Sequence, residues 1–274
     1  MVDLRLSRER IVSRYDELAR SEKFPDNTDL HRTFLKLINS ELKPMPLNIL
    51  DAGGGTGFFA VNLAMLNHQV TLLDLSSETL TVARKRSYEG KCSKHITNVE
   101  GDVEHLPFRA ECFDVVVCAF VLAHLNNPDR AFKEFRRVLR KGGRLFISFE
   151  NKLWHVVAAG LREKYGEAIS LISSKSPVVK PYDLLPPIRI YSILEIEQLC
   201  QRHGFRISSF TGMRYLTSYQ ESLKGIGTTE AEQLLRDNPK AQKLERMLME
   251  SGELLCLARH IFVCCEVDQN LRIA

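Results

Sequence analysis

Residues 46–60, PLNILDAGGGTGFFA, decide the fold of this chain. A strand-compatible segment leads to Asp51, a cluster of glycines follows, and the apolar face of a helix begins after it. Glycine adopts positive φ readily and lets the backbone approach a ligand closely. The helix after the turn directs its free N–H groups and the positive end of its dipole toward the turn. The stretch therefore predicts a strand, a tight turn and a helix that together bind a nucleotide-type cofactor.

Two cofactor motifs fit these glycines. Residues 55–60, GTGFFA, match the dinucleotide fingerprint G-x-G-x-x-G/A. Counted from Asp51, the same letters read D-x-G-x-G-x-G, which resembles motif I of class I S-adenosylmethionine (SAM) methyltransferases. In a dinucleotide site the first glycine follows the strand closely, whereas Gly55 lies four residues after Asp51 and the glycines at 53–54 would be surplus. Motifs further along the chain have to separate the two interpretations.

The composition is that of an ordinary globular protein. The chain has 274 residues, of which 44% are hydrophobic and 26% charged, and this length can bury a single large core. The N-terminus has no signal-peptide core, and the longest apolar run, 115–123, is far too short to cross a bilayer. Seven cysteines without a C-x-x-C pair predict neither a disulfide framework nor a zinc site. We therefore expect a soluble, cytoplasmic protein with no membrane span and no metal site.

Three further motifs follow in the order of the methyltransferase pattern. The strand at 69–74, QVTLLD, ends in Asp74, whose carboxylate we expect to accept the hydrogens of a ribose diol. A strand at 96–100 leads to Gly-Asp-Val at 101–103, for which a plain β-turn is the alternative. The run at 113–120, FDVVVCAF, is typical of a buried parallel strand, and a helix from Pro128 to Leu139 and a strand at 144–149 follow it.

These motifs over residues 47–150 make the chain resemble the class I SAM methyltransferases. In that family the acid after the third strand reaches the adenine amino group, and Asp102 stands at this position. The resemblance implies SAM as the cofactor. It places these residues around it: Asp51, Gly53, Gly55, Gly57, Asp74, Leu75, Asp102, Val103 and Ala119.

The rest of the chain predicts additions to this core. The expected parts are a helical cover at 1–46, the SAM-binding core at 47–150, a lid insertion at 151–190, and the C-terminal part of the same domain at 191–274. In the last part we expect a helix at 194–203, a strand at 205–210, a long helical stretch to about 250 and a strand at 260–267. The predicted fold is a doubly wound α/β sheet of seven mostly parallel strands, with helices on both faces and an antiparallel last strand.

Methyl transfer from a sulfonium is an in-line displacement in which the protein mainly positions the acceptor. A carboxylate acceptor needs no base, whereas a phenol or a carbon acid usually does. The candidate bases are His124 after the fourth strand and Glu150 at the end of the fifth, with His155 as a third; packing or capping is the alternative for each. Arginine binds carboxylates in a bidentate manner. The candidate acceptor-binding residues are Asn151, Arg189 and Arg214, with Arg259 as a further arginine, and a solvated surface role is the alternative for the arginines.

A narrower resemblance concerns the acceptor. LDAGGG at 50–55, Glu-Asn at 150–151, TGMRYLTSY at 211–219 and ARHIFV at 258–263 resemble a bacterial tRNA methyltransferase. That enzyme esterifies the carboxylate of 5-carboxymethoxyuridine at the wobble position, but its lid sequence differs from residues 151–190. The resemblance implies a carboxylate on a modified tRNA uridine as the acceptor. The net charge of +4 argues little for nucleic acid by itself, although residues 151–190 contain six basic and three acidic residues.

Alternatives to this function remain open at the level of sequence. One is the methylation of a small metabolite, either a quinone-type ring or a carboxylated compound. Two others belong to different classes of protein, namely a dinucleotide-dependent oxidoreductase and a SAM-binding partner protein without catalytic activity. The sequence also leaves the oligomeric state open.

Overall fold

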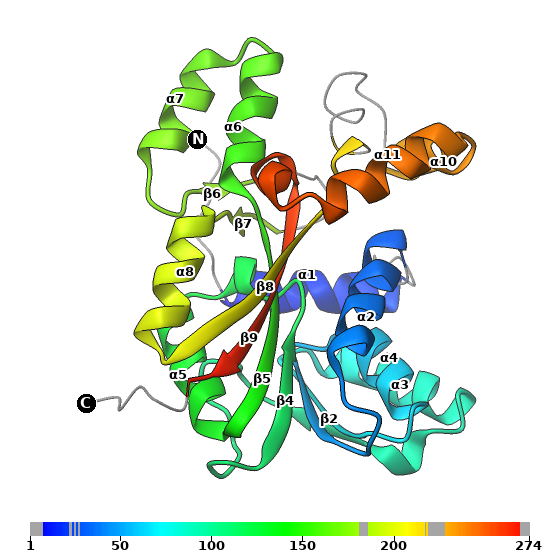
Figure 1. The fold of residues 1–274 in the computed structure, drawn as a ribbon. Helices are drawn as coiled ribbons and strands as arrows, with labels where there is room; N and C mark the ends of the chain where they lie inside the picture. Colours follow the sequence, from blue (N-terminus) through cyan, green and yellow to red (C-terminus); the bar gives the residue numbers. More distant parts are fainter. Residues whose placement is uncertain are drawn as a thin grey trace.

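The computed structural model describes residues 8–21, 24, 26, 28–180, 186–216, 218 and 228–268. Within these ranges seven strands form one sheet in the order β3-β2-β1-β4-β5-β9-β8 (Figure 1). The strands β1 to β5 pair in parallel, and β9 runs antiparallel to both β5 and β8. This arrangement confirms the predicted α/β fold with its antiparallel last strand. The strands are β1 (Asn48–Ala52), β2 (Gln69–Asp74), β3 (Ile96–Glu100), β4 (Phe113–Cys118), β5 (Leu139–Glu150), β8 (Phe205–Met213) and β9 (His260–Val267).

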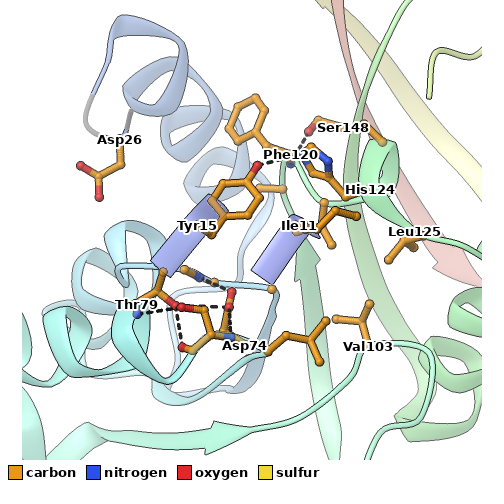
Figure 2. Close-up of a pocket in the computed structure, with 18 of the residues that line it drawn as sticks. Ile11, Tyr15, Asp26, Asp74, Thr79, Val103, Phe120, His124, Leu125 and Ser148 are labelled. Atoms are coloured by element: carbon orange, nitrogen blue, oxygen red, sulfur yellow. Dashed lines mark hydrogen bonds between the residues drawn. The ribbon is translucent and has the colours of Figure 1, made fainter. Parts of the chain in front are cut away.

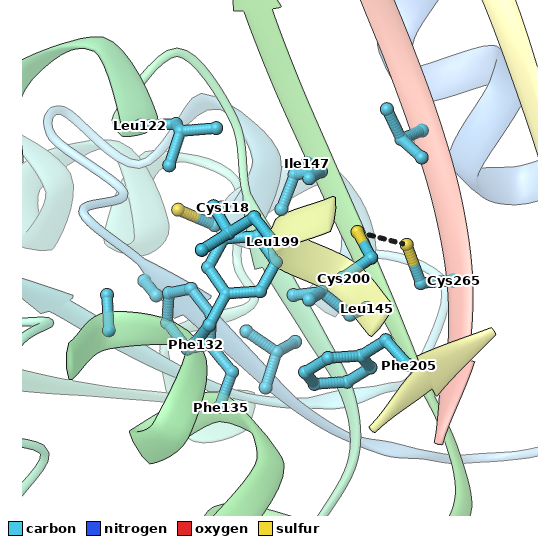
Figure 3. Close-up of a cluster of buried hydrophobic side chains, with 14 of the residues drawn as sticks. Cys118, Leu122, Phe132, Phe135, Leu145, Ile147, Leu199, Cys200, Phe205 and Cys265 are labelled. Atoms are coloured by element: carbon cyan, nitrogen blue, oxygen red, sulfur yellow. Dashed lines mark hydrogen bonds between the residues drawn. The ribbon is translucent and has the colours of Figure 1, made fainter. Parts of the chain in front are cut away.

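Helices cover both faces of the sheet, and on each face a buried cluster of side chains lies between the sheet and the helices. On one face α2 (Asp29–Glu41), α3 (Phe58–Ala64) and α4 (Ser77–Glu89) contribute buried residues such as Phe34 and Leu63. On the other face α5 (Pro128–Val138) and α8 (Ile193–Arg202) contribute Phe132 and Leu199 (Figure 3). The helix α1 (Arg8–Arg20) crosses beside the carboxyl ends of the strands (Figure 1).

Alternation along the central strands explains how one sheet serves both clusters. Successive side chains of a strand point to opposite faces. Thus Leu50 belongs to the cluster under α5 and α8, whereas its neighbour Ile49 belongs to the cluster under α2, α3 and α4. The thiols of Cys200 and Cys265 are buried in the cluster under α5 and α8, with their sulfur atoms 3.6 Å apart (Figure 3). Like the other cysteines they are free, which fits the role of small apolar core residues.

Three element boundaries differ from the predicted ones. The fifth strand begins at Leu139, not at residue 144, because Leu139 already pairs with Phe113 across the sheet. The predicted strand at 205–210 continues to Met213, which pairs with His260. The long helical stretch before residue 250 is divided into α10 (Thr228–Arg236) and α11 (Pro239–Glu250). Its division follows from an Asn-Pro signal, since Asn238 caps the second helix and proline takes its first position.

The predicted lid insertion consists of a helical hairpin and a small pair of strands. The hairpin of α6 (Lys152–Leu161) and α7 (Tyr165–Ser173) projects from the body of the molecule (Figure 1). The strands β6 (Val178–Val179) and β7 (Ile188–Arg189) pair in antiparallel fashion nearer to the sheet. The division of the chain into a cover, a core and a lid stays a prediction.

Among the described residues there are also three short 3₁₀ segments, at 93–95, 122–124 and 252–257. Among the helices in the described ranges, none combines the length and the apolar character that crossing a bilayer requires. The same ranges bring together no group of three His, Cys, Asp or Glu side chains that could hold a metal ion. The cytoplasmic location expected from the sequence stays a prediction.

Candidate active site

A cavity of about 1040 Å³ lies at the carboxyl ends of the central strands. Its lining comes from the turn after β1, the ends of β2 and β5, the loops after β3 and β4, and the helix α1. In an open α/β sheet this edge is where ligands bind. The volume is at the upper end of the range for small-molecule sites, so a cofactor and an acceptor fit in the same space.

The glycine turn has no room for side chains. A Cβ atom on Gly53 would lie 2.5 Å from Val121 Cγ2, and one on Gly54 would lie 2.6 Å from Asp51 Oδ2. Both Gly53 and Gly55 have positive φ, at 76° and 53°. The turn therefore presents bare backbone to the cavity, as the sequence predicted for a site that a ligand approaches closely.

Asp51 and Gly57 support this turn from behind. Asp51 is buried, and its Oδ2 accepts a hydrogen bond from the Ala60 N–H at 3.0 Å, which ties β1 to the start of α3. Burial raises the pKa of Asp51 to about 7, with the Ala60 N–H lowering it and the charge of Asp74 raising it. Gly57 has a φ of 81°, and a Cβ there would lie 2.9 Å from Ala83 Cβ on α4. Neither residue lines the cavity.

Asp74 lines the cavity at the end of β2. Its Oδ2 accepts the Gly55 N–H at 2.8 Å, and its Oδ1 accepts the Ser76 N–H at 2.9 Å and the Thr79 hydroxyl at 3.2 Å. Burial raises the pKa of this carboxyl group, while the same hydrogen bonds act in the opposite direction. These contacts fix the carboxylate beside the glycine turn, where the sequence predicted a ribose ligand.

Asp102 follows β3, the strand next to β2, and also lines the cavity. Its Oδ1 accepts the Glu104 N–H at 2.9 Å, and its Oδ2 lies 2.7 Å from Arg8 Nη2 and 3.1 Å from His105 Nδ1. The contact with Arg8 also ties the start of α1 to the rim of the cavity. Seven of the nine residues expected around the cofactor line the cavity: Gly53, Gly55, Asp74, Leu75, Asp102, Val103 and Ala119. Their individual roles toward the cofactor stay predictions.

His124 lies on the wall of the same cavity, in the loop after β4. Burial lowers its pKa to about 4, and the charge of Glu150 opposes this only in part. Its Nε2 lies 2.8 Å from Tyr15 Oη on α1 (Figure 2). Burial, together with the charge of Asp74, raises the pKa of Tyr15 well above its ordinary value. His124 is therefore a neutral, weakly basic imidazole at neutral pH.

Glu150 is buried at the end of β5 and also lines the cavity. Its Oε2 lies 2.6 Å from His155 Nε2 and 3.5 Å from Arg259 Nε. The guanidinium of Arg259 lies 4.5 Å from the centre of the Trp154 ring, in a cation–π contact. Burial alone would raise the pKa of Glu150, but Arg259, His155 and His260 together hold it well below its usual range. An ionised carboxylate in this ion pair is a poor proton acceptor, so the geometry does not favour Glu150 as a base.

The predicted acceptor-binding residues separate into two groups. Arg214 lines the cavity, in a left-handed backbone conformation with a φ of 60°. Asn151 instead serves the chain itself, because its amide donates to the carbonyls of Cys256 and Ala258 and its oxygen caps α6. Arg189 lies on β7, away from the lining of the cavity. Of the described residues at 151–190, Ile188 alone contributes to the lining.

Aromatic and imidazole rings line the remainder of the cavity, and the sequence did not single out most of them. The ring of His31 on α2 lies 4.6 Å from that of Phe120 and 5.5 Å from that of Phe58, measured between centroids. Burial lowers the pKa of His31 to about 4 and that of His260 to about 3. The Arg259 and Arg214 charges also lower the pKa of His260, so Arg214 acts electrostatically within the cavity. Two signals were readable, because Phe58 belongs to the glycine motif and His260 to the terminal ARHIFV motif.

The family model of a methyltransferase domain matches residues 50–147. This part of the chain is a class I, SAM-dependent methyltransferase domain. The match confirms the SAM interpretation of the glycine turn over the dinucleotide one. The tRNA-specific part of the resemblance stays a prediction.

A relative of this methyltransferase domain is the ubiquinone/menaquinone biosynthesis C-methyltransferase UbiE of Agrobacterium fabrum, with 36% identity over 124 residues. The match covers 43% of this chain and 48% of that protein, so the chain spans about half the length of the curated relatives it matches. Two solved structures are similar in fold. One is the Burkholderia thailandensis 1,6-didemethyltoxoflavin-N1-methyltransferase with bound S-adenosylhomocysteine (TM-score 0.57, 16% identity, 95% of this chain and 89% of that one). The other is the [4+2]-cyclase SpnF (TM-score 0.59, 17% identity, 87% of this chain and 82% of that one).

The residues of the methyltransferase domain fit SAM. A Cβ atom at Gly53 or Gly54 would collide with the side chain of Val121 or Asp51, so only bare backbone fits in this turn. The carboxylate of Asp74 stands at its edge, held by backbone N–H groups on both oxygens. Such a carboxylate suits the diol of a nucleoside. When bound, SAM supplies an electrophilic methyl group and a thioether leaving group.

Proposed function

We propose that the protein transfers the methyl group of SAM to an acceptor that is already an anion, with a carboxylate as the reacting group. The main support is the weak basicity of the imidazoles in the cavity. Burial holds the pKa of His31 and His124 near 4 and that of His260 near 3. A general base works best with a pKa near the working pH. A carboxylate is ionised at neutral pH and needs no such base.

Arg214 supports an anionic acceptor independently. Arg214 lines the cavity and its charge lowers the pKa of His260, and guanidinium groups recognise carboxylates by paired hydrogen bonds. Glu150, the carboxylate at this end of the cavity, is offset by the adjacent Arg259. The local charge around the acceptor therefore favours an anion.

The chain's own part in the reaction is binding, orientation and exclusion of water. Asp74 and the turn at Gly53 would hold the ribose of SAM, and Asp102 would hold its adenine ring. Arg214 would hold the acceptor carboxylate in line with the methyl group, a positioning effect worth up to about 7–11 kcal/mol. The helix α1, tied to Asp102 through Arg8, would keep water out of the cavity.

The narrower sequence resemblance supports a carboxylate on a modified tRNA uridine as the physiological acceptor. A quinone-type ring is the second candidate, favoured by the name of the curated relative and by the rings of His31, Phe58 and Phe120 in the cavity. A phenolic or carbon acceptor of that kind would need a base. His124 would then have to take that role despite its low pKa.

The decisive experiment offers labelled SAM to the purified protein with bulk tRNA, small carboxylates or hydroquinones. A carboxylate acceptor gives a methyl ester, which mild alkali hydrolyses. The value of kcat should then vary little from pH 6 to 9, because no base has to be deprotonated. A Gly55→Arg variant is the blank, because even a Cβ there would lie 3.1 Å from the Phe24 ring. Alkali-stable transfer to a hydroquinone, with kcat that follows the ionisation of a base, would overturn the carboxylate proposal in favour of the ring.

A further inference from the structure

We propose that Tyr15 is a positioning residue that holds His124 and thereby latches α1 over the cofactor cavity. The Tyr15 hydroxyl lies 2.8 Å from His124 Nε2, and the two rings meet edge to face with centroids 5.5 Å apart (Figure 2). The residues are 109 positions apart in the chain. Their contact, called the latch below, exists only while α1 is docked. This role rests on the proposed function, since the latch closes the same cavity.

The latch joins two groups that are neutral throughout the physiological range of pH. Burial and the charge of Asp74 raise the pKa of Tyr15, so its hydroxyl keeps the proton. Burial lowers the pKa of His124 to about 4, so its imidazole stays uncharged. A hydrogen bond between neutral groups, here half-buried, depends little on the salt concentration. The latch should therefore act in the same way from pH 6 to 9.

Other contacts of α1 include a hydrogen bond that the Ser76 hydroxyl, at the start of α4, donates to Asp16, together with ion pairs at the surface. Of the 13 residues of this helix, all of them described, Leu18 and Ala19 are buried. Its ion pairs involve exposed arginines, since the side chains of Arg8 and Arg20 are 40% and 62% exposed. Exposed ion pairs contribute little to stability. Few buried residues mark a segment that opens locally at low cost, so the loss of one half-buried hydrogen bond should loosen its docking measurably.

Docking of α1 has a direct consequence for the site. Ile11, Val12 and Tyr15 of α1 form part of the cavity wall. Opening of the helix would let a nucleoside cofactor enter, and its return before methyl transfer would exclude water from the site. His124 stands in the loop directly after Ala119 and Phe120, which also line the cavity. Holding His124 therefore fixes this loop at the same time as α1.

The test is a double-mutant cycle of Tyr15→Phe and His124→Ala, with Tyr88→Phe on α4 as a control, because Tyr88 is 79% exposed. The probe is S-adenosylhomocysteine (SAH), and its affinity is measured by calorimetry. We expect each single variant to bind SAH about three- to tenfold more weakly, as for one lost neutral hydrogen bond. The double variant should lose no more SAH affinity than the single variant that binds SAH more weakly, because both substitutions remove the same contact. The Tyr88→Phe variant should bind as the parent protein does.

Two further measurements separate positioning from general packing. Hydrogen exchange of the α1 amides should be faster in Tyr15→Phe than in the parent, with and without SAH. The imidazole ¹⁵N signals of His124 should report one fixed tautomer in the parent and an averaged state in Tyr15→Phe. Unchanged SAH affinity and unchanged α1 exchange in Tyr15→Phe, or losses that simply add in the double variant, would overturn the latch. Absence of SAH binding in the parent would overturn the proposed function, while exchange in the free proteins would still decide the latch.

Discussion

Replacing Asp51 by asparagine should change how the stability of the free protein depends on pH. Asp51 is a fully buried carboxyl group beneath the glycine turn, 1% exposed, and its pKa is raised to about 7. In the unfolded chain the same group titrates near about 4. Between these two values the folded protein holds a proton that the unfolded chain has released. The stabilisation that Asp51 contributes is therefore fully present below pH 4 and is lost as the pH rises toward 7.

The magnitude follows from the width of this window. Each pH unit within it costs about 1.4 kcal/mol of unfolding free energy. From pH 5 to pH 8 the parent protein should lose about 2–3 kcal/mol through this group. Asparagine keeps an oxygen that can accept the Ala60 N–H and carries no charge. The Asp51→Asn variant should therefore gain about 2–3 kcal/mol relative to the parent over the same range.

Urea denaturation at pH 5, 6, 7 and 8 measures the difference. Asp237→Asn is the matched control, because Asp237 is exposed at the end of α10 and should leave the pH dependence as it is. Parallel curves for the parent protein and Asp51→Asn would refute the reasoning. They would mean that the buried carboxyl group is not the source of the pH dependence.

Three further predictions concern the turn, the ribose ligand and the buried ion pair. Gly53→Ala, whose new Cβ would meet a side chain at 2.5 Å, should destabilise the protein by about 1–3 kcal/mol in thermal unfolding. Gly166→Ala, with no atom within 4 Å of its Cβ, should be tolerated. In Asp74→Asn, one of the two oxygens that accept a backbone N–H is replaced by an NH₂ group, which is itself a donor. Calorimetry should then show that SAH binds at least about tenfold more weakly. Arg259→Met removes the arginine of the buried ion pair and leaves Glu150 with histidine partners alone, which should cost about 3–5 kcal/mol in urea denaturation. Arg206→Met, in an exposed ion pair, should cost less than about 1 kcal/mol in the same assay.

Local signals in the sequence were enough to predict the glycine turn, the start of α5 and the acids at the ends of the strands. The glycine spacing after Asp51 predicted backbone that only glycine adopts easily, and Gly53, Gly55 and Gly57 all have positive φ. The Asn-Pro signal at 127–128 predicted the start of α5. Acids at the ends of strands predicted Asp74 and Asp102 at the cavity, because the carboxyl ends of parallel strands meet at one edge of the sheet. All these features depend on residues a few positions apart, so one sequence suffices to read them.

The tertiary structure alone decided which side chains share the cavity. Tyr15 and His124 meet across 109 positions, and Arg259 neutralises Glu150 only because β9 pairs with β5. The same packing turned Asn151 toward the backbone of residues 256–258 and left Arg189 outside the cavity. Basicity was equally invisible in the sequence, because the pKa of His124 is set by burial among residues from distant elements. Strand order and burial are properties of the whole chain, and no local spacing encodes them.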